Sequence, residues 1–214
     1  LSAHNRRLLG WDEILAGPLP AGATVMSWRG TEGGITAAKA GHDVVMAPSD
    51  VLYLDYLQTV SADEPPGRPA LSPLEDVYAF DPVPKALDAQ QAKHILGVQA
   101  NVWTEHMRDF GRVQHALFPR IAALAEVAWS PQPQRRYGDF LKRLPAMLPR
   151  WQAQGIAVAQ TPFAPQEALA AASNGDARVT LQQPLGYVMR YTTDGSAPNA
   201  GSPEYFAPLQ LSLP

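Results

Sequence analysis

The sequence predicts an α/β fold of parallel strands and helices, followed by a small all-β module. Three apolar runs, at residues 7–11, 23–28 and 43–47, are separated by polar or glycine-rich loops. Near-continuous apolar runs of this length are typical of strands that are buried on both faces, as in a parallel sheet. Between the second and third runs, an alanine-rich stretch at residues 33–41 closes on a glycine and predicts a helix. This order of elements is a βαβ unit.

The composition is that of a folded protein, and it excludes several classes of function. Hydrophobic residues make up 46% of the 214 residues, which suffices for a packed core. The 17 Lys and Arg against 20 Asp and Glu give a net charge of −3 without a basic run, which argues against a nucleic-acid groove or an anionic membrane surface. The absence of Cys excludes disulfides, thiolate metal sites and a cysteine nucleophile. No apolar run approaches the roughly 20 residues of a membrane-spanning helix.

The middle of the chain interrupts the strand–helix rhythm and then restores it. Residues 61–93 are rich in proline and loop-forming residues, so we expect an insertion over one face of the sheet. Residues 95–103 predict a fourth strand. Pro119 fits the first turn of a helix that stops before Pro131. A further helix is expected over residues 137–153, although two internal prolines weigh against its continuity.

The sequence pattern changes in the last part of the chain and predicts a separate module there. The short β runs there are separated by turn dipeptides, among which Asp194-Gly195 is the strongest signal. The runs lie at residues 178–181, 187–193 and 209–211. We expect a domain boundary near residues 154–165. The first unit then spans residues 1–157, and an incomplete, β-sandwich-like module spans residues 158–214.

Aromatic and acidic residues follow the ends of the predicted strands. In barrels of alternating strands and helices, residues at the C-terminal strand ends line the active site. Flat sugar faces and acetyl methyl groups pack on aromatic rings, while carboxylates accept hydrogen bonds from hydroxyl groups. The pattern therefore predicts a sugar pocket, with packing of the indoles in the core as the alternative. The residues concerned are Trp11, Trp28, Tyr53, Asp55, Trp103 and Glu105.

Motifs around these residues resemble glycoside hydrolase family 20, the β-N-acetylhexosaminidases and chitobiases. The ordered motifs are Gly-Trp-Asp-Glu-Ile-Leu at residues 10–15, Met-Ser-Trp-Arg-Gly at 26–30, Tyr-Leu-Asp at 53–55 and Val-Trp-Thr-Glu at 102–105. Residues 118–130 resemble the last barrel helix of the family. Residues 190–198 resemble the small β module that follows the barrel in chitobiase-like bacterial members. The resemblance covers nearly the whole chain and is weakest over residues 61–93.

The resemblance implies strands five to eight of a (β/α)8 TIM-type barrel, followed by part of the β module. A complete barrel needs about 250 residues, and the chain begins with Leu1 without a signal-like segment, so we interpret it as a piece of a longer protein. Open barrel edges would favour self-association. The interior side chains expected to lose their neighbours are Leu8, Val25, Met26, Val45, Val98 and Ala100. Members of this bacterial type are commonly periplasmic or exported.

The resemblance also implies residue roles for an N-acetylhexosamine-containing oligosaccharide. The three indoles box the acetyl methyl group, Tyr53 donates its hydroxyl to the acetamido carbonyl, and Asp55 and Glu105 hold ring hydroxyls. The family mechanism is substrate-assisted, an exception to the two-carboxylate scheme. The acetamido oxygen attacks the anomeric carbon, so fixing that group is worth a large proximity effect. A nearby phenol and carboxylate then stabilise the charge of the oxazoline-like intermediate. No cofactor or metal is implied, and the five histidines are scattered.

The family's catalytic Asp-Glu pair and the sugar-binding Arg near the first strand have no counterpart here. Asp12-Glu13 is an adjacent acidic pair, but it directly follows Trp11 and fits the segment after the fifth strand. We therefore interpret it as supporting the site or starting a helix, where acidic residues are favourable. The alternative function is a non-catalytic carbohydrate-binding protein. An Asp-Glu pair encoded upstream of Trp11 would favour the enzyme.

Overall fold

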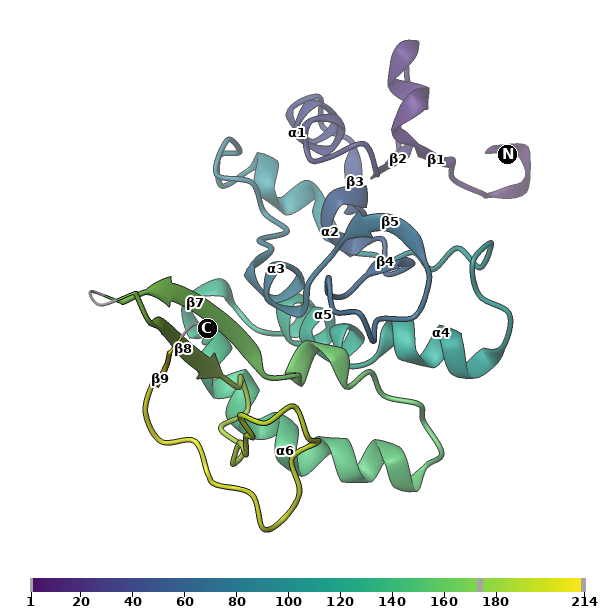
Figure 1. Cartoon of the computed structure of the whole chain (residues 1–214). Coiled ribbons are helices and arrows are strands. Elements are labelled where there is room, and N and C mark those ends of the chain that lie inside the picture. Colours follow the sequence, from purple (N-terminus) through teal and green to yellow (C-terminus); the bar gives the residue numbers. More distant parts are fainter. Residues whose placement is uncertain (1, 173–174, 213–214) are drawn as a thin grey trace.

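The computed structural model describes residues 2–172 and 175–212, and its first part is built on a four-stranded parallel sheet (Figure 1). The strands, in their order across the sheet, are β1 (Leu9–Trp11), β2 (Thr24–Ser27), β3 (Asp43–Met46) and β6 (Ile95–Val98). All neighbours pair in parallel, which confirms the four strands expected from the apolar runs. The fourth strand is shorter than expected and ends at Val98.

Helix α1 (Glu32–Lys39) connects β2 and β3 and covers one face of the sheet. Its alanines pack on Val25, Val44 and Met46, and Gly41 reverses the chain with a φ of +81°. Val25 is therefore wholly buried against α1. The expectation that Val25 and Met26 lose their neighbours at an open barrel interior is wrong, because both side chains are buried.

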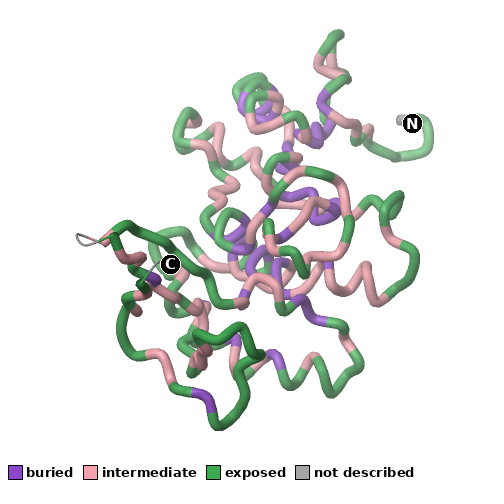
Figure 2. Tube along the Cα trace, viewed as in Figure 1, coloured by how far each residue is buried: buried purple, intermediate pink, exposed green. Residues whose placement is uncertain are grey.

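The main core lies below the sheet, where several helices meet; Figure 2 shows the buried segments gathered there. The helices are α2 (Ser49–Leu52), α3 (Leu74–Ala79), α4 (Phe110–Leu117), α5 (Arg120–Trp129) and α6 (Tyr137–Ala153). Short 3-10 turns are Ser2–His4, Asp12–Ala16 (η2), Gln91–His94, Gln132–Gln134 and Thr161–Phe163 (η5). Helix α6 runs through Pro145 and Pro149 because Phe140, Leu144 and Leu148 lie on its buried face.

The segment expected to be an insertion over one face of the sheet is more ordered than its loop-forming sequence indicates. Strands β4 (Tyr56–Leu57) and β5 (Arg68–Leu71) form a small parallel pair, and α3 follows them. Leu74, Val77 and Tyr78 of α3 are buried in the main core. The expected insertion therefore contains a strand pair and a helix. The apolar spacing of α3 is helical, but the prolines that precede it hid this signal.

The C-terminal part forms a three-stranded antiparallel sheet. It consists of β7 (Gln166–Ala171), β8 (Ala177–Gln182) and β9 (Leu209–Leu211), in that order. Strands β8 and β9 match the expected runs, whereas β7 was not expected. The strand expected at residues 187–193 is wrong: only an isolated bridge joins Arg190 to Glu204. Pro203 has no N–H to donate beside this bridge, so a ladder cannot extend through it.

A buried arginine connects the core to the segment that carries Tyr53 and Asp55. Arg120, at the start of α5, has no exposed surface, and its guanidinium donates to the carbonyl oxygens of Leu54, Ser72 and Ala116 at 2.5–3.1 Å. Burial lowers the pKa of Arg120 to about 9, mainly by desolvation. Three stretches that are distant in sequence are thereby held at one cation.

Within the described ranges, no helix is both long and apolar enough to cross a membrane.

Candidate functional site

One cavity of about 430 Å³ gathers most of the expected site residues at the C-terminal end of the parallel sheet. Five of the six expected residues line it, and Glu13 and Arg68 join them. The lining consists of Trp11, Glu13, Trp28, Tyr53, Arg68, Trp103 and Glu105. Asp55 is not part of the wall. The three indoles therefore meet at one end of the strands.

The strand register explains why Trp11 and Trp28 share this edge. Trp11 is the last residue of β1 and pairs with Met26 of β2. Trp28 directly follows β2, two residues beyond that pair. Because parallel strands end at the same edge of a sheet, both rings project into the same space.

Tyr53 and Trp103 reach the edge through a short extension of the pairing between β3 and β6. An isolated parallel bridge joins Tyr53 to Asn101. The Leu54 amide donates to the Asn101 carbonyl oxygen at 2.8 Å, and the Asn101 amide donates to the Leu52 carbonyl oxygen at 2.9 Å. The bridge and these hydrogen bonds continue the pairing of the two segments beyond the ends of β3 and β6. Trp103 stays 43% exposed at the rim of the cavity.

Trp28 is fixed between an acid and a phenol. Its indole nitrogen donates to Oε1 and Oε2 of Glu13 at 3.0 and 3.1 Å, and its ring lies 6.3 Å from the ring of Tyr53. Backbone hydrogen bonding, followed by the bond from Trp28, lowers the pKa of the Glu13 carboxyl. Glu13 therefore holds the indole as a charged acceptor at neutral pH.

Asp12 lies beneath this wall and binds Arg29. The side chain of Asp12 is 4% exposed, and it accepts hydrogen bonds from the Arg29 backbone amide at 3.3 Å and from Arg29 Nε at 2.9 Å. Asp12 and Glu13 also form the first turn of η2, which confirms the helix-starting interpretation of this pair. Both carboxylates are occupied in positioning neighbours of the cavity.

The hydroxyl of Tyr53 is kept as a hydrogen-bond donor. Burial raises its pKa, as do the charge of Asp55 and the neighbouring phenol of Tyr56, while a side-chain hydrogen bond from Trp103 and the charge of Arg68 oppose this shift. The hydroxyl therefore stays protonated at neutral pH. Tyr53 lines the cavity together with the three indoles, and its hydroxyl can donate to a carbonyl oxygen placed there.

Asp55 is buried below the cavity rather than on its wall. Its side chain is 2% exposed, and Arg68 Nε lies 3.4 Å from its Oδ2 atom. Burial raises the pKa of Asp55, and Glu105 adds to this shift. The backbone amides of Asp55 and Trp103 and the charge of Arg68 oppose it. The exposed Glu105 lies on the other side of Arg68, with its Oε1 atom 3.9 Å from Nη2.

Glu13 and Arg68 line the cavity although neither was predicted to do so from the sequence. Glu13 had a usable signal, because it follows Trp11 closely at the end of a predicted strand. Arg68 had none, because it lies in the proline-rich segment and reaches the cavity only through the fold. His106 lines an adjoining cavity of about 490 Å³, which shares Glu105 with the first.

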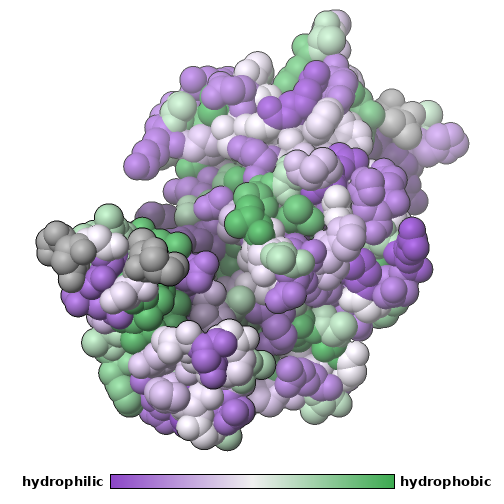
Figure 3. Space-filling model, in the orientation of Figure 1, coloured by the Kyte–Doolittle hydropathy of each residue, from purple (hydrophilic) through white to green (hydrophobic). Residues whose placement is uncertain are grey.

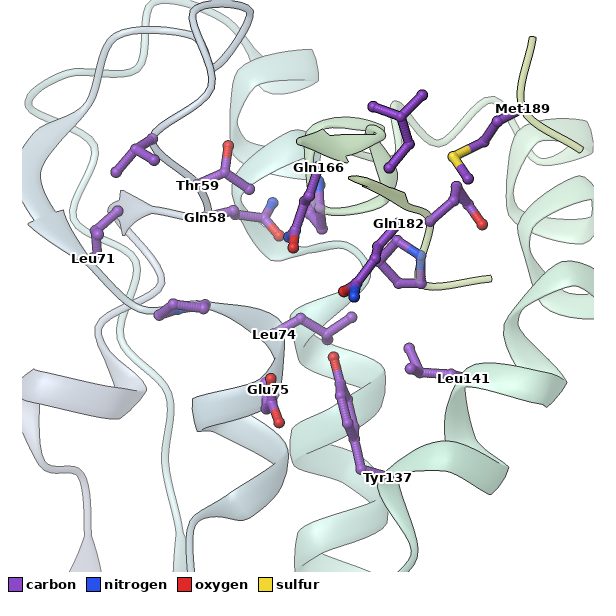
Figure 4. Close-up of a pocket in the computed structure, with 16 residues that line it drawn as sticks. Gln58, Thr59, Leu71, Leu74, Glu75, Tyr137, Leu141, Gln166, Gln182 and Met189 are labelled. Carbon is purple, nitrogen blue, oxygen red and sulfur yellow. The ribbon is translucent and has the colours of Figure 1, made fainter. Parts of the chain in front are cut away.

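A larger cavity of about 730 Å³ lies between the first part of the chain and the C-terminal sheet. Figure 3 shows the hollow on this face, and in Figure 4 Gln58 and Gln166 approach it from opposite sides. Among the described residues that line it, Tyr137 is the one aromatic residue and Glu75 the one acid. It lacks the converging indoles and carboxylates of the smaller cavity, which we therefore take as the site. Among the described residues, no group of three or more His, Asp or Glu side chains could hold a metal ion.

Comparisons with known proteins agree with this geometry. Residues 1–132 match the model of the glycosyl hydrolase family 20 catalytic domain, and residues 170–214 match the chitobiase/beta-hexosaminidase C-terminal domain. A beta-hexosaminidase of Porphyromonas gingivalis is 39% identical over 99% of the chain and 28% of its own length. A beta-N-acetylhexosaminidase of Cellulomonas fimi is 32% identical over 71% of the chain and 31% of its own length.

Solved structures show the same similarity. A GH20 exo beta-N-acetylglucosaminidase from Vibrio harveyi, in complex with N-acetylglucosamine, gives a TM-score of 0.71 at 31% identity, covering 76% of this chain and 26% of that one. A mutant Streptomyces plicatus beta-hexosaminidase in complex with the product GlcNAc gives a TM-score of 0.67 at 27% identity, covering 75% of this chain and 34% of that one. The chain thus spans about a third or less of each of these four proteins.

Proposed function

Because the chain belongs to glycosyl hydrolase family 20, we propose that its cavity binds the terminal N-acetylhexosamine of a β-linked glycoside. The family is one of TIM barrels, and a module follows the barrel part here. We propose that the four parallel strands are strands five to eight of that barrel. On this proposal residues 1–157 belong to the catalytic domain and residues 158–214 to the module.

The observation that carries the proposal is the convergence of three indoles and one phenol on a single cavity of about 430 Å³. Trp11, Trp28 and Trp103 enclose the acetyl methyl group, which packs on ring faces. The Tyr53 hydroxyl donates to the acetamido carbonyl oxygen. Glu105 on the wall accepts the hydrogens of ring hydroxyls, and the buried Asp55 supports this side of the cavity through Arg68.

The proposed reaction is retaining hydrolysis assisted by the substrate. The acetamido oxygen attacks the anomeric carbon as the glycosidic bond breaks, and the leaving oxygen takes a proton from a general acid. Water then opens the oxazoline-like intermediate. The indoles hold the acetamido group in a near-attack position, and the Tyr53 hydroxyl stabilises the charge that develops on it. We place the general acid outside this chain, since Asp12 and Glu13 are bound to Arg29 and Trp28.

Binding of the monosaccharide tests the cavity. Titration calorimetry of the chain with N-acetylglucosamine, and with glucosamine as the matched sugar without the acetyl group, measures what the indoles recognise. Burying the methyl and pairing the carbonyl predict at least about tenfold tighter binding of N-acetylglucosamine. Equal affinities would contradict an acetamido site.

Hydrolysis tests where the general acid lies. We expect the chain alone not to cleave an aryl N-acetylglucosaminide at an enzymatic rate, since a positioned acid is typically worth 10²–10⁴-fold. Robust turnover that is lost in Glu13→Gln would instead make Asp12-Glu13 the catalytic pair.

A further inference from the structure

Arg68 stands between two carboxylates of the candidate site, Asp55 and Glu105, and contacts both. Its Nε atom lies 3.4 Å from Asp55 Oδ2, and its Nη2 atom lies 3.9 Å from Glu105 Oε1. The guanidinium also lies 6.0 Å from the ring centre of Tyr56. A planar guanidinium can serve two acceptors at once in a fixed orientation, which an ammonium cannot do in the same way.

Arg68 supplies the positive charge that favours the ionised form of the buried Asp55. The Asp55 side chain is buried, and neither carboxylate oxygen makes a hydrogen bond of normal geometry. A buried carboxylate without a partner is strongly unfavourable and tends to take up a proton. Burial raises the pKa of Asp55 most, and Glu105 adds to this shift. The backbone amides of Asp55 and Trp103, and then the charge of Arg68, oppose it.

Arg68 reaches this place from outside the barrel pattern. It begins β5, whose partner β4 directly follows Asp55 in the chain. The Arg68 side chain is 38% exposed and lines the same cavity as the three indoles. The short parallel pair of strands therefore delivers a cation to the side of the cavity where the carboxylates lie.

We propose that Arg68 is a positioning residue of the sugar site: the buried Asp55 holds it from below, and Arg68 in turn orients Glu105, the wall carboxylate that accepts the hydroxyl hydrogens of the terminal sugar. The inference rests on the proposed function and extends it, because it names the group that sets the geometry of hydroxyl recognition. Without Arg68, two neighbouring carboxylates would repel each other, and the buried one would be protonated at a higher pH.

The test compares Arg68→Gln and Arg68→Lys with the unchanged chain by calorimetric titration with N-acetylglucosamine between about pH 4 and 8. We expect Arg68→Gln to weaken binding about tenfold at neutral pH. We also expect the unchanged chain to lose affinity on acidification, as Asp55 takes up a proton and releases Arg68, and we expect this loss to be absent from Arg68→Gln. Arg68→Lys keeps the positive charge but loses the planar guanidinium that serves two acceptors at once. It should therefore still lose affinity on acidification, as the unchanged chain does, and bind N-acetylglucosamine several-fold more weakly at neutral pH.

A double-mutant cycle with Asp55→Asn separates positioning from a structural role. If Arg68 acts through Asp55, Arg68→Gln has a much smaller effect in the Asp55→Asn background. Arg190→Gln is the matched control, because it breaks a comparable ion pair with Glu204, at 2.7 Å, in the C-terminal part. Circular dichroism and thermal unfolding confirm that each variant is folded.

Two results would overturn the proposal about Arg68. One is affinity of Arg68→Gln within about twofold of the unchanged chain at every pH. The other is an equal loss in the Asp55→Asn background. Failure of the unchanged chain to bind N-acetylglucosamine would contradict the proposed function itself, so the two failures can be told apart.

Discussion

Trp28 donates its indole N–H to both carboxylate oxygens of Glu13, at 3.0 and 3.1 Å. This contact joins the residue that follows β2 to the first turn of η2 after β1. It fixes the orientation of the Trp28 ring in the cavity wall, which neither strand end does alone. An adjacent acidic pair thus serves the site through an indole, and Arg29 occupies its other member, Asp12.

Replacing Glu13 tests this role. Glu13→Ala frees the Trp28 indole to rotate, so we expect affinity for N-acetylglucosamine to fall about tenfold, in line with a lost charge-assisted hydrogen bond. Glu13→Gln keeps one acceptor oxygen and should lose less. Glu32→Ala, at the exposed start of α1, serves as the control. Equal binding by Glu13→Ala and Glu32→Ala would show that Glu13 does not position the indole.

The Tyr53 hydroxyl is expected to bind the acetamido carbonyl oxygen. We expect Tyr53→Phe to weaken binding of N-acetylglucosamine about tenfold and to leave glucosamine binding unchanged, since glucosamine has no carbonyl. Because burial raises the pKa of Tyr53, binding by the unchanged chain should not fall through loss of this proton below about pH 10. Tyr56→Phe is the control, since its ring lies 5.9 Å from that of Tyr53 but does not line the cavity. An equal loss for both sugars would argue that Tyr53 only packs.

A buried acid predicts how stability depends on pH. Glu64 accepts hydrogen bonds from Thr161 and from the Gln58 amide, and it lies 3.5 Å from His115 Nε2. Burial alone would raise its pKa, but these partners, led by His115, lower it from 4.5 to about 2. Because the pKa of Glu64 is lower in the folded state than in the unfolded state, ionised Glu64 stabilises the folded state at pH values above its unfolded pKa of about 4.5. This stabilisation, on the order of 2–3 kcal/mol, is lost as the pH falls from about 4.5 to about 2.

Urea unfolding across this pH range measures the effect. The Glu64→Gln variant should be less stable at neutral pH and should lose little further stability on acidification. The exposed Glu167 of β7 gives the matched control, Glu167→Gln. Parallel stability curves for Glu64→Gln and the unchanged chain would exclude Glu64 as the titrating group.

The ends of the parallel sheet predict self-association. Among the described residues, the edge strands β1 and β6 each pair with one neighbouring strand only. Leu9 of β1 is 54% exposed and Leu96 of β6 is 60% exposed. Unpaired edges with apolar side chains favour contact between copies. Light scattering should therefore give a dimer or a larger species, and Leu9→Lys with Leu96→Lys should shift it toward monomer. A compact monomer that stays soluble at high concentration would contradict this prediction.

The strands and most of the cavity could be predicted because each depends on a local pattern. Apolar runs marked β1, β2 and β3, and aromatic residues at their ends marked the wall. Strand β7 had no such pattern: all six of its residues are exposed, and its alanines and Glu167 favour a helix in isolation. Pairing with β8 overrides that preference.

The contacts between distant segments could not be predicted. Arg68 lies at the site because β4 and β5 pair, and neither the proline-rich sequence nor its spacing indicates that contact. Asp55 was expected on the wall because it lies just past the third strand, two residues after Tyr53, yet its side chain is buried and meets Arg68 instead. Residue type indicated the chemistry, while burial decided which atoms face the cavity.

The most direct test follows the indole N–H signals of the five tryptophans in an NMR titration with N-acetylglucosamine. Trp11, Trp28 and Trp103 line the cavity, whereas Trp129 is 88% exposed elsewhere and Trp151 packs on Phe118 at 5.2 Å. Single Trp→Phe variants assign the signals. If the cavity is the acetamido site, the first three signals shift together with one dissociation constant and the other two stay in place. Shifts confined to Trp129 or Trp151, or no shift in the three cavity indoles at saturating sugar, would contradict the account.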